Sequence, residues 1–359
     1  MLYPIIMAGG QGTRLWPVSR KASPKQIRPF LDGKTLLHKT YLRLLKGVPA
    51  ENIYLSTAKG IFPEARKEVP DLPEGNIILE PARRDTAAAL GLALFKIYKR
   101  DPEGIFVYVN SDNFVKDQTE YVRTMKLGEE IVEKYPGKTL LVGVKPFYPE
   151  TGYGYIRAGR EFARFPGGAV YEAEEFVEKP DLETAKKFLE SENYFWNPTL
   201  IIGRVDNFIR LYEKHLPEMC GKLKEIAQYF DTPKEEWIME RIFPEIEPIS
   251  VDYGILEKER EMLVLPADFG WMDIGHWRAI WEMSAENEED NVTVGRHIHI
   301  GSAGNLIYST GKKLVATVGL KNMMIIETED TIMICPKDRA QDVKKIVQKL
   351  EEDGFAEYL

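Results

Sequence analysis

Residues 3–26 have the sequence "YPIIMAGGQGTRLWPVSRKASPKQ". The apolar run over residues 3–7 predicts a short buried strand. Three glycines follow this run, and they leave backbone amides free to approach phosphate oxygens closely. These glycines are Gly9, Gly10 and Gly12. Since they come at the carboxyl end of a predicted strand, they predict a phosphate-handling loop in an α/β fold.

Two cations stand in the same loop. Arg14 can hold phosphate oxygens with its planar fork of donors, and Lys25 adds a point charge further along the chain. A dinucleotide-binding motif, Gly-x-Gly-x-x-Gly, does not fit, because Leu15 stands where the third glycine is needed. A surface turn with solvated charges is the simpler alternative. The combination of freed amides and aimed cations favours phosphate binding instead.

The Gly-Lys-Thr sequence at residues 33–35 does not complete a P-loop. A P-loop carries a glycine five residues before the second glycine, and Arg28 occupies that position. We instead predict a turn at Asp32 and Gly33, followed by a helix over 36–46 with Thr35 as its N-cap.

Apolar runs alternate with helical patterns through the first half of the chain. Such alternation is typical of βαβ units with a mostly parallel sheet, whose site lies at the carboxyl ends of the strands. The predicted strands are 3–7, 52–56, 76–79, 105–109 and 139–144, and the predicted helices are 35–46, 59–69, 84–100 and 119–134. A mixed pattern follows, with strands predicted at 153–158, 170–178 and 198–203 and helices at 181–190, 204–229 and 233–241.

The sequence changes character after Asn291. Short β-rich pieces carry aliphatic residues at six-residue spacing, which is a cue for a β-helix; an antiparallel meander fits the spacing equally well. The chain then predicts a terminal helix that Gly354 stops. Its apolar stripe consists of Val343, Ile346, Val347 and Leu350. We place the domain boundary near 285–292.

The composition excludes some classes of protein. The 359 residues carry a formal charge of −8, which argues against a nucleic-acid binder with a general basic surface. Cys220 and Cys335 match neither a metal-ligand spacing nor a disulfide framework, so we expect a cytoplasmic protein. No apolar run approaches the roughly 18–20 residues of a membrane span, and no leader is expected at the N-terminus.

The loop over residues 9–26 strongly resembles the N-terminal motif of sugar-1-phosphate nucleotidyltransferases. Its "LWPxSRxxxPKQ" form is similar to that of mannose-1-phosphate guanylyltransferases, also called GDP-mannose pyrophosphorylases. Further matching motifs follow in order and extend the resemblance over essentially the whole chain. They are "EPARRDTAAA" at 80–89, "NSDNF" at 110–114, "TGYGYI" at 151–156, "FVEKP" at 176–180, "WNPT" at 196–199 and "GWMDIGHW" at 270–277.

The resemblance implies a fold and a reaction. The fold is α/β, with a Rossmann-like, GT-A-like nucleotidyltransferase domain over 1–288. A left-handed β-helix-like segment and a C-terminal helix follow over 289–359. The reaction is the transfer of GMP from GTP to mannose 1-phosphate, which gives GDP-mannose and pyrophosphate. The sugar phosphate attacks the α-phosphorus directly with Mg²⁺ as cofactor, so the protein mainly positions and neutralises two polyanions.

The resemblance also assigns residues to the nucleotide and the metal. Asp112, at the end of a predicted strand, and Asp273, in "WMDIGHW", would hold Mg²⁺ and act in catalysis together with Arg14 and Lys25. A strand-end aspartate read alone is more often a turn or cap residue. The family usually has histidine where this chain has Asn113. The nucleotide would be bound by Ala8, Gly9, Gly10, Gly12, Thr13, Arg14 and Lys25.

The sugar phosphate would meet the "FVEKP" residues. Glu178 would accept sugar hydroxyls and Lys179 would meet the 1-phosphate, although a solvated pair at a strand end is the alternative. Gly154 would let the sugar approach the backbone, and an ordinary bulge is the other reading. Asn197 is a further sugar ligand implied by the resemblance, in a loop where residues 198–199 replace the family's Ser-Gly.

Guanine offers adjacent N1–H and N2–H₂ donors that one carboxylate can accept together. Asp85 is the candidate for this role, and capping of the following helix is the alternative. His297 and His299 would share one strand face, but two histidines without further ligands predict surface or core residues rather than a metal site.

Alternative functions stay open. The closest is transfer to another sugar from another nucleotide, such as thymidylyl transfer to glucose 1-phosphate. A non-catalytic regulatory homologue that binds sugar nucleotides is a second alternative, although it would be expected to lack Arg14, Lys25 or one of the aspartates. The resemblance implies a homodimer formed through the C-terminal region. We expect no nucleic-acid or membrane partner and, because the chain ends at Leu359, no isomerase domain.

Overall fold

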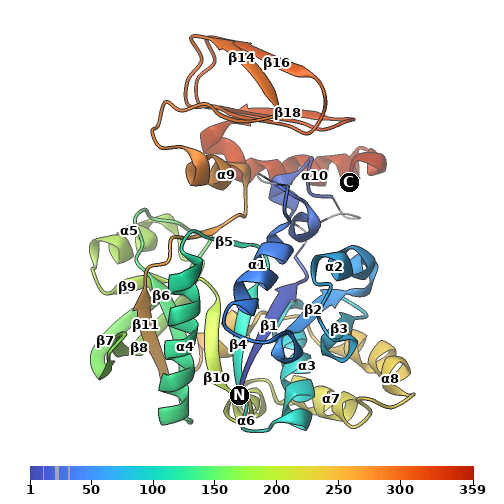
Figure 1. Ribbon diagram of the computed structural model, residues 1–359, viewed down its shortest axis with the longest axis vertical. Helices are drawn as coiled ribbons and strands as arrows, with labels where there is room; N and C mark the ends of the chain where they lie inside the picture. The colour runs from blue at the N-terminus through green and yellow to red at the C-terminus, as the bar shows by residue number, and fades with distance from the viewer. Residues whose placement is uncertain (11, 21–23, 31–32) are drawn as a thin grey trace. The chain divides into compact units, whose positions relative to one another are not determined.

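The computed structural model describes residues 1–10, 12–20, 24–30 and 33–359 (Figure 1). Four residues of the loop quoted above, 11 and 21–23, lie outside the described residues, as does Asp32 of the predicted turn. The chain forms two compact units. The first unit comprises Met1–Gly9, Thr40–Ser111 and Val115–Trp271, and the second comprises Gly10–Lys39, Asp112–Phe114 and Met272–Leu359. The division of the sequence at 288/289 concerned consecutive segments and stays a prediction.

The first unit is built on one ten-stranded sheet with the order β11-β8-β7-β9-β6-β10-β4-β1-β2-β3. Strands β4, β1, β2 and β3 are parallel, as the alternation predicts, and Ile5 of β1 lies between Tyr54 and Tyr108. β10 runs antiparallel to both β4 and β6, so the sheet as a whole is mixed. The strands are β1 (Leu2–Ala8), β2 (Tyr54–Ala58), β3 (Ile77–Glu80), β4 (Ile105–Asn110), β6 (Thr139–Val144), β7 (Gly154–Phe165), β8 (Gly168–Glu178), β9 (Tyr194–Trp196), β10 (Leu200–Arg204) and β11 (Met262–Ala267).

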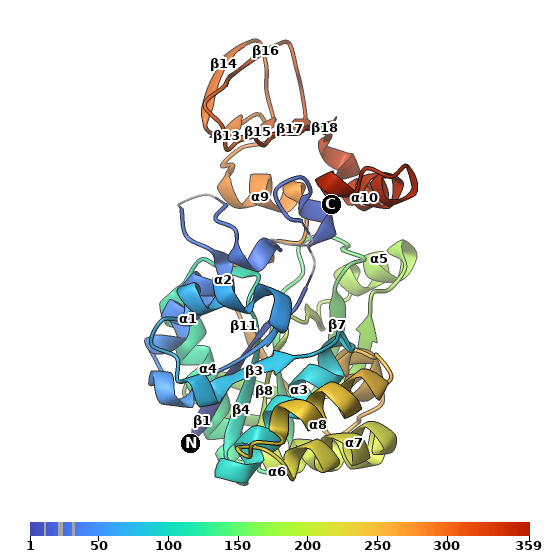
Figure 2. The same cartoon turned by 90° about the vertical axis from the view of Figure 1, so that its right-hand side faces the viewer.

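Helices cover both faces of this sheet, which is why all seven residues of β1 are buried and read as one apolar run. Figure 2 shows α4 on one side and α3, α7 and α8 on the other. The helices are α1 (Leu36–Leu45), α2 (Phe62–Glu68), α3 (Asp85–Arg100), α4 (Gln118–Lys134), α5 (Leu182–Glu190), α6 (Val205–His215), α7 (Pro217–Ala227) and α8 (Glu235–Ile242). The Thr35 hydroxyl accepts a hydrogen bond from the His38 amide at 3.1 Å, which confirms the predicted N-cap of α1.

The single helix predicted over 204–229 is wrong. The chain forms α6 and α7 there, because Pro217 has no amide hydrogen to continue the helical hydrogen bonds and instead occupies the first turn of α7.

The second unit contains parallel coils of short strands. β13 (Val292–Val294), β15 (Leu306–Ser309) and β17 (Met323–Glu327) pair in parallel, as do β14 (Arg296–Ile300) and β16 (Leu314–Val318). The β-helix-like prediction is therefore confirmed (Figure 2). The alternative of an antiparallel meander holds only for β17 and β18 (Ile332–Pro336).

The phosphate loop belongs to the core of this second unit. Leu15 and Trp16 are buried in one cluster with Trp277 of α9 (Trp277–Ser284) and Val343 of α10 (Val343–Glu352). The Trp277 indole donates to the Trp16 carbonyl at 2.9 Å. The predicted stripe on α10 is only partly correct, since Ile346 is 44% exposed.

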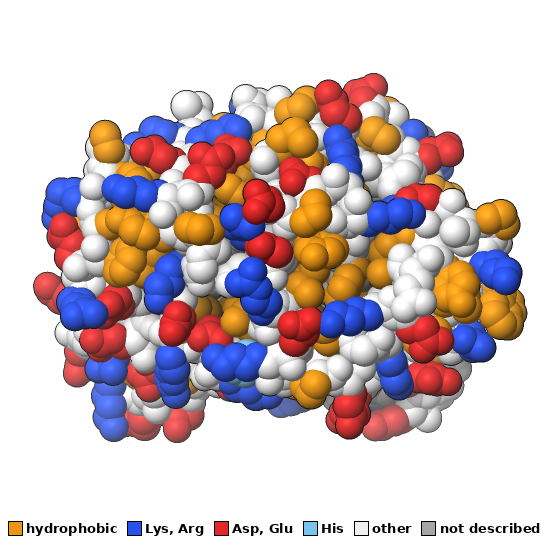
Figure 3. Space-filling model, turned by 90° about the horizontal axis from the view of Figure 1, so that it is seen from below, with side chains coloured by type: hydrophobic (Ala, Val, Ile, Leu, Met, Phe, Trp, Pro, Cys, Tyr) orange, Lys and Arg blue, Asp and Glu red, His pale blue; other side chains and the backbone are white. Residues whose placement is uncertain are grey.

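Among the helices that the structure describes, none is long and apolar enough to cross a membrane. On the face seen in Figure 3, basic and acidic side chains are interspersed with small hydrophobic areas.

Candidate active site

The glycine-rich loop folds back over Lys25. Gly12 has φ 62°, and a Cβ there would lie 2.8 Å from both Lys25 Cγ and Ser19 Oγ, so only glycine fits. The Gln26 side-chain amide donates to the Gly10 carbonyl at 2.9 Å. Thr13 and Arg14 follow in a single 3₁₀ turn, Thr13–Leu15. The loop therefore holds its two predicted cations in one compact segment.

Lys25 joins the two predicted metal ligands. Its side chain is 7% exposed, and Nζ lies 2.8 Å from Asp112 Oδ2 and 3.8 Å from Asp273 Oδ1. It also donates to the Ile274 carbonyl at 2.9 Å. Burial alone would lower the pKa of Lys25, but the two carboxylates raise it above its ordinary value. Residues from three distant parts of the sequence thus meet within the second unit.

The pair of aspartates fits a hard cation. The carboxylates of Asp112 and Asp273 both approach the Lys25 ammonium, so the position between them stabilises positive charge. Carboxylate oxygens are also ligands that Mg²⁺ prefers. Within the described part of the chain, no three or more His, Cys, Asp or Glu side chains gather as a metal site. A Mg²⁺ ion held by Asp112 and Asp273 would therefore take its other ligands from water and substrate phosphates, as this ion commonly does.

Arg14 lies beside the same aspartate. A Cβ on Gly275 would lie 2.7 Å from Asp273 Oδ2 and 3.2 Å from Arg14 Nη2. The guanidinium also donates to Gln341 Oε1 at 2.9 Å. Next to them, His276 Nδ1 accepts the Ala279 amide at 3.2 Å and so caps α9. Burial and the nearby positive charge of Arg14 lower the pKa of His276 to about 4, which keeps this cap neutral.

In the first unit, the end of β1 faces a carboxyl group that the sequence analysis did not single out. Ala8 accepts the Thr57 hydroxyl at 3.1 Å, and a Cβ on Gly9 would lie 3.9 Å from Glu80 Oε1. The Ser56 hydroxyl donates to that oxygen at 2.8 Å. Burial raises the pKa of Glu80 to about 7. The feature of the sequence that could have pointed to Glu80 is its position at the carboxyl end of a predicted strand, where site residues are expected in an α/β fold.

The four predicted sugar-site residues come together in the first unit. The backbone N–H of Asn197 donates to the Gly154 carbonyl at 2.8 Å, and a Cβ on Gly154 would lie 2.6 Å from Glu178 Oε2. Glycine is therefore required beside this carboxylate. Glu178 forms an ion pair with Lys179, whose backbone has φ 51°. The Glu178 side chain is 8% exposed and that of Lys179 is 54% exposed, so the carboxylate of the pair is buried while the lysine is partly solvated.

Asp252 is a further member of this cluster that sequence reasoning missed. It begins the π-helical turn Asp252–Leu256, and its Oδ1 accepts the Asn197 side-chain amide at 3.3 Å. Burial and the negative charge of Glu178 raise the pKa of the Asp252 carboxyl. No motif or spacing in the sequence pointed to it.

Asp85 opens α3 with φ 62°, and its Oδ1 accepts the Thr86 amide at 2.7 Å. The side chain is exposed. It therefore bonds to the first turn of its own helix, and its role with guanine stays a prediction.

His297 is one of the two histidines that the sequence places on one strand face. Its Nε2 forms a hydrogen bond with the Thr317 hydroxyl at 2.9 Å.

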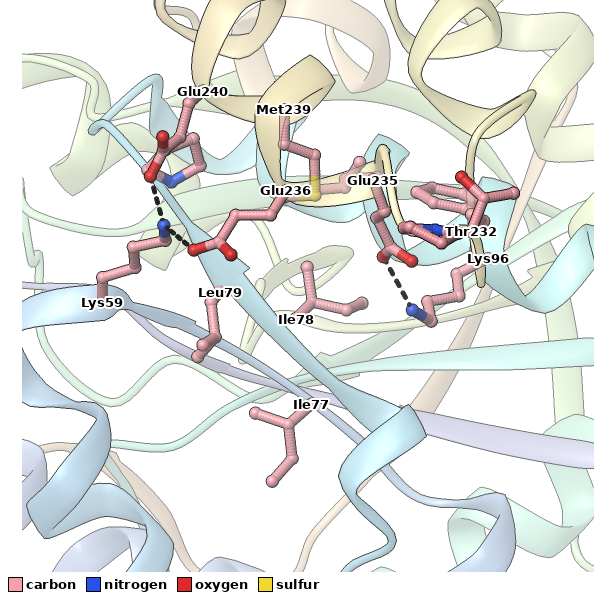
Figure 4. A pocket seen from close by; sticks show the side chains of 14 residues that line it. Lys59, Ile77, Ile78, Leu79, Lys96, Thr232, Glu235, Glu236, Met239 and Glu240 are labelled. Atoms are coloured by element: carbon pink, nitrogen blue, oxygen red, sulfur yellow. Dashed lines mark hydrogen bonds and ion pairs between the residues drawn. The ribbon is translucent and has the colours of Figure 1, made fainter.

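A cavity of about 420 Å³ lies elsewhere in the first unit, between β3 and α8 (Figure 4). Its lining is largely apolar, and its two lysines pair with its three glutamates: Lys59 with Glu236 and Glu240, and Lys96 with Glu235. None of its lining residues is a predicted site residue. An apolar cavity with neutralised charges does not suit two polyanionic substrates.

Fold, loop and converging charged residues together define a nucleotidyltransferase. A family model described as nucleotidyl transferase matches residues 3–290, and a MannoseP isomerase/GMP-like beta-helix domain matches residues 295–350. A mannose-1-phosphate guanylyltransferase of Escherichia coli (strain K12) is 35% identical over 99% of this chain and 75% of its own length. A putative mannose-1-phosphate guanylyltransferase of Vibrio cholerae is 36% identical over 100% and 76%. The crystal structure of a protein described as mannose-1-phosphate geranyltransferase from Thermus thermophilus matches with TM-score 0.88 and 32% identity, over 98% of this chain and 99% of that chain. The chain therefore belongs to the nucleotidyltransferase family and, within it, to the mannose-1-phosphate guanylyltransferases.

Proposed function

We propose that this enzyme transfers GMP from GTP to mannose 1-phosphate and releases pyrophosphate. The observation that carries the proposal is the meeting of Lys25, Asp112 and Asp273 at the glycine-rich loop. The names of the E. coli and V. cholerae relatives support the choice of mannose 1-phosphate and a guanylyl donor. The reaction needs positioning and charge neutralisation rather than a covalent intermediate.

On this proposal the loop binds the triphosphate. Backbone amides at Gly10, Gly12 and Thr13 face phosphate oxygens, and Arg14 and Lys25 neutralise the charge that moves to the departing pyrophosphate. Ala8 and Gly9 continue the same backbone at the end of β1. Lys25 is suited to this work because its burial strengthens its electrostatic effect on a phosphate.

Asp112 and Asp273 would hold Mg²⁺, which when bound neutralises phosphate charge and orients the reacting oxygens. This chain supplies two carboxylates and an ammonium group in contact, so the three side chains must share or exchange partners when substrate phosphates arrive. Arg14 beside Asp273 provides the further donor near these oxygens.

The sugar phosphate would bind in the first unit. Glu178 and Asn197 offer an acceptor and an amide to the sugar hydroxyls, and the Lys179 ammonium meets the 1-phosphate. Gly154 lets Glu178 and Phe176 lie against the backbone, since a Cβ there would come within 2.6 Å of Glu178 Oε2 and 2.9 Å of Phe176 Cζ. Asp85 is the proposed reader of guanine, with one carboxylate oxygen already bonded to Thr86.

We further propose a homodimer that forms through the C-terminal strands. β14 and β16 pair so that Ile298, Ile300, Leu314 and Val318 share one face, and each is more than half exposed. An exposed aliphatic face of this kind marks a protein contact. Ile300→Lys combined with Val318→Lys is expected to give a monomer in sedimentation experiments, whereas a wild-type monomer at micromolar concentration would contradict the dimer.

The free thiols of Cys220 and Cys335 support a reducing, cytoplasmic setting.

A substrate panel tests the proposed reaction. Pyrophosphate release is measured for the four common nucleoside triphosphates against mannose, glucose and N-acetylglucosamine 1-phosphates, with and without Mg²⁺. We expect the highest kcat/KM with GTP and mannose 1-phosphate and none without the metal. A preference for dTTP and glucose 1-phosphate would support the alternative transferase, and binding of GDP-mannose without turnover would support the regulatory homologue.

A further inference from the structure

The side-chain amide of Asn197 is held at both of its polar atoms. Its Nδ2 donates to Asp252 Oδ1 at 3.3 Å, and its Oδ1 accepts the Thr199 backbone amide at 3.0 Å. A half-turn of the amide would place its oxygen against a carboxylate and its NH₂ against an N–H group. Both contacts would then be repulsive, so the two partners fix the amide in one orientation. Asn197 is 6% exposed, which leaves little water to compensate a flipped amide.

Asp252 is itself held by segments on both sides of the cluster. The Val251 amide donates to the Thr86 hydroxyl at 2.9 Å, and the Ala87 amide donates to the Ile249 carbonyl at 3.1 Å. Five residues after Asp252, Glu257 Oε1 accepts the Glu178 amide at 3.0 Å. The segment over 249–257 is therefore anchored to the start of α3 and to the end of β8. Supports of this kind hold a polar group in place before a ligand binds.

The position of Asp252 is electrostatically unfavourable. Burial is the main cause that raises the pKa of the Asp252 carboxyl, the negative charge of Glu178 adds to it, and the positive charge of Lys179 opposes both. Among the described residues, Asn197 provides the side-chain hydrogen bond to the Asp252 carboxylate. A carboxylate kept beside a second carboxylate, with its hydrogen bond directed at one amide, is typical of a functional constraint.

We propose that Asp252 is a positioning residue for the sugar site, which acts through Asn197 to fix where that amide donates and where it accepts. This inference rests on the proposed function. With the amide fixed, one remaining N–H of Nδ2 and one lone pair of Oδ1 point in set directions toward the bound ligand. A hexose whose hydroxyl matches these directions is bound, and one with an inverted hydroxyl leaves a buried polar group unpaired. Asp252 thus contributes to selectivity between hexose 1-phosphates without touching them.

A double-mutant cycle tests this role. The variants are Asp252→Asn, which keeps the shape but no longer enforces the amide orientation, Asn197→Ala, and the two combined. KM and kcat are measured for mannose 1-phosphate, glucose 1-phosphate and GTP, and the dissociation constant of mannose 1-phosphate is measured by calorimetry. Thermal unfolding of each variant is recorded alongside. The matched control is Asp231→Asn, an exposed ion-paired aspartate away from the cluster.

We expect Asp252→Asn to raise KM and Kd for mannose 1-phosphate about 10-fold and to leave KM for GTP within about 2-fold. Its preference for mannose over glucose 1-phosphate should fall by a similar factor. In the Asn197→Ala background, Asp252→Asn should change these constants less than about 2-fold. Equal effects of Asp252→Asn in both backgrounds would mean that Asp252 contacts the sugar itself and would overturn the proposal, as would an equal rise of KM for GTP or no effect.

Wild-type turnover separates this inference from the proposed function. If another sugar phosphate is the better substrate, the proposed function fails while the cycle on that sugar still decides the role of Asp252. If the wild type turns over mannose 1-phosphate and the cycle is additive, the inference fails and the proposed function stands. If there is no turnover, the calorimetric cycle on sugar phosphate binding decides.

Discussion

The ammonium of Lys25 lies 2.8 Å from Asp112 Oδ2, although Lys25 belongs to the glycine-rich loop and Asp112 follows β4. Asp273, from a third segment, lies 3.8 Å from the same nitrogen. Each of these charged groups depends on the others, since a buried ammonium needs nearby carboxylates and two neighbouring carboxylates need a cation. A substitution in this contact is therefore expected to affect both the stability of the second unit and the proposed reaction.

Replacing Asp112 by asparagine is expected to lower kcat/KM at least about 100-fold, because one of the two negatively charged ligands proposed for Mg²⁺ is lost. The same change leaves the buried Lys25 with less compensation, so we expect a loss of roughly 1–3 kcal/mol in unfolding free energy. Pyrophosphate release and denaturant unfolding measure the two effects. Asp338→Asn, at an exposed position of the same unit, is the control and should change neither. Full activity of Asp112→Asn at saturating Mg²⁺ would contradict the assignment.

The C-terminal residues are expected to support the loop through Trp16. Its indole N–H donates to the Tyr358 carbonyl at 2.8 Å, and the ring is buried. Trp16→Phe keeps most of the packing and removes this bond, so we expect a destabilisation of about 1 kcal/mol. Because the Thr13–Leu15 turn precedes it directly, KM for GTP should rise a few-fold. Trp237→Phe, at a 58% exposed position, is the control for loss of an indole. An unchanged midpoint of unfolding would show that the bond contributes nothing.

The sequence predicts the parallel strands well, because burial on both faces leaves continuous apolar runs such as residues 3–7. It also predicts the phosphate loop, whose glycines and cations are neighbours in the sequence. Glu80 and Asp252 were missed for a physical reason: their significance comes from partners far along the chain, Ser56 and Asn197. A local pattern cannot report such a contact. The joining of residues 10–39 with the C-terminal strands in one compact unit was missed for the same reason.

Glu80 should make the stability of the protein depend on pH. Its pKa is raised from 4.5 to about 7 by burial, so the folded state retains a proton that the unfolded state releases. Its contribution to stability is complete below about pH 4.5 and is lost as the pH rises through 7. Glu80→Gln, which can still accept the Ser56 hydroxyl, should therefore be more stable than wild type at pH 8.5 by roughly 3 kcal/mol and equal to it near pH 4.5.

Urea unfolding at both pH values measures this difference. Glu74→Gln, an exposed glutamate shortly before β3, controls for the loss of one negative charge and should follow the wild type at both pH values. A Glu80→Gln protein that is less stable than wild type at pH 8.5 would contradict the expected sign.

Asp85 provides the test of guanine recognition. Its backbone has φ 62°, a conformation that asparagine also adopts readily, and its Oδ1 accepts the Thr86 amide. Asp85→Asn can preserve both features but offers one acceptor oxygen in place of two, so it cannot hold Thr86 and accept both guanine donors. We expect the ratio of kcat/KM for GTP over ATP to fall about 10- to 100-fold, mainly through GTP, with thermal stability nearly unchanged. Competition between the two nucleotides in one reaction measures this ratio directly. If the ratio is unchanged while α3 remains intact, the carboxylate serves only the first turn of that helix, and guanine is read by another group.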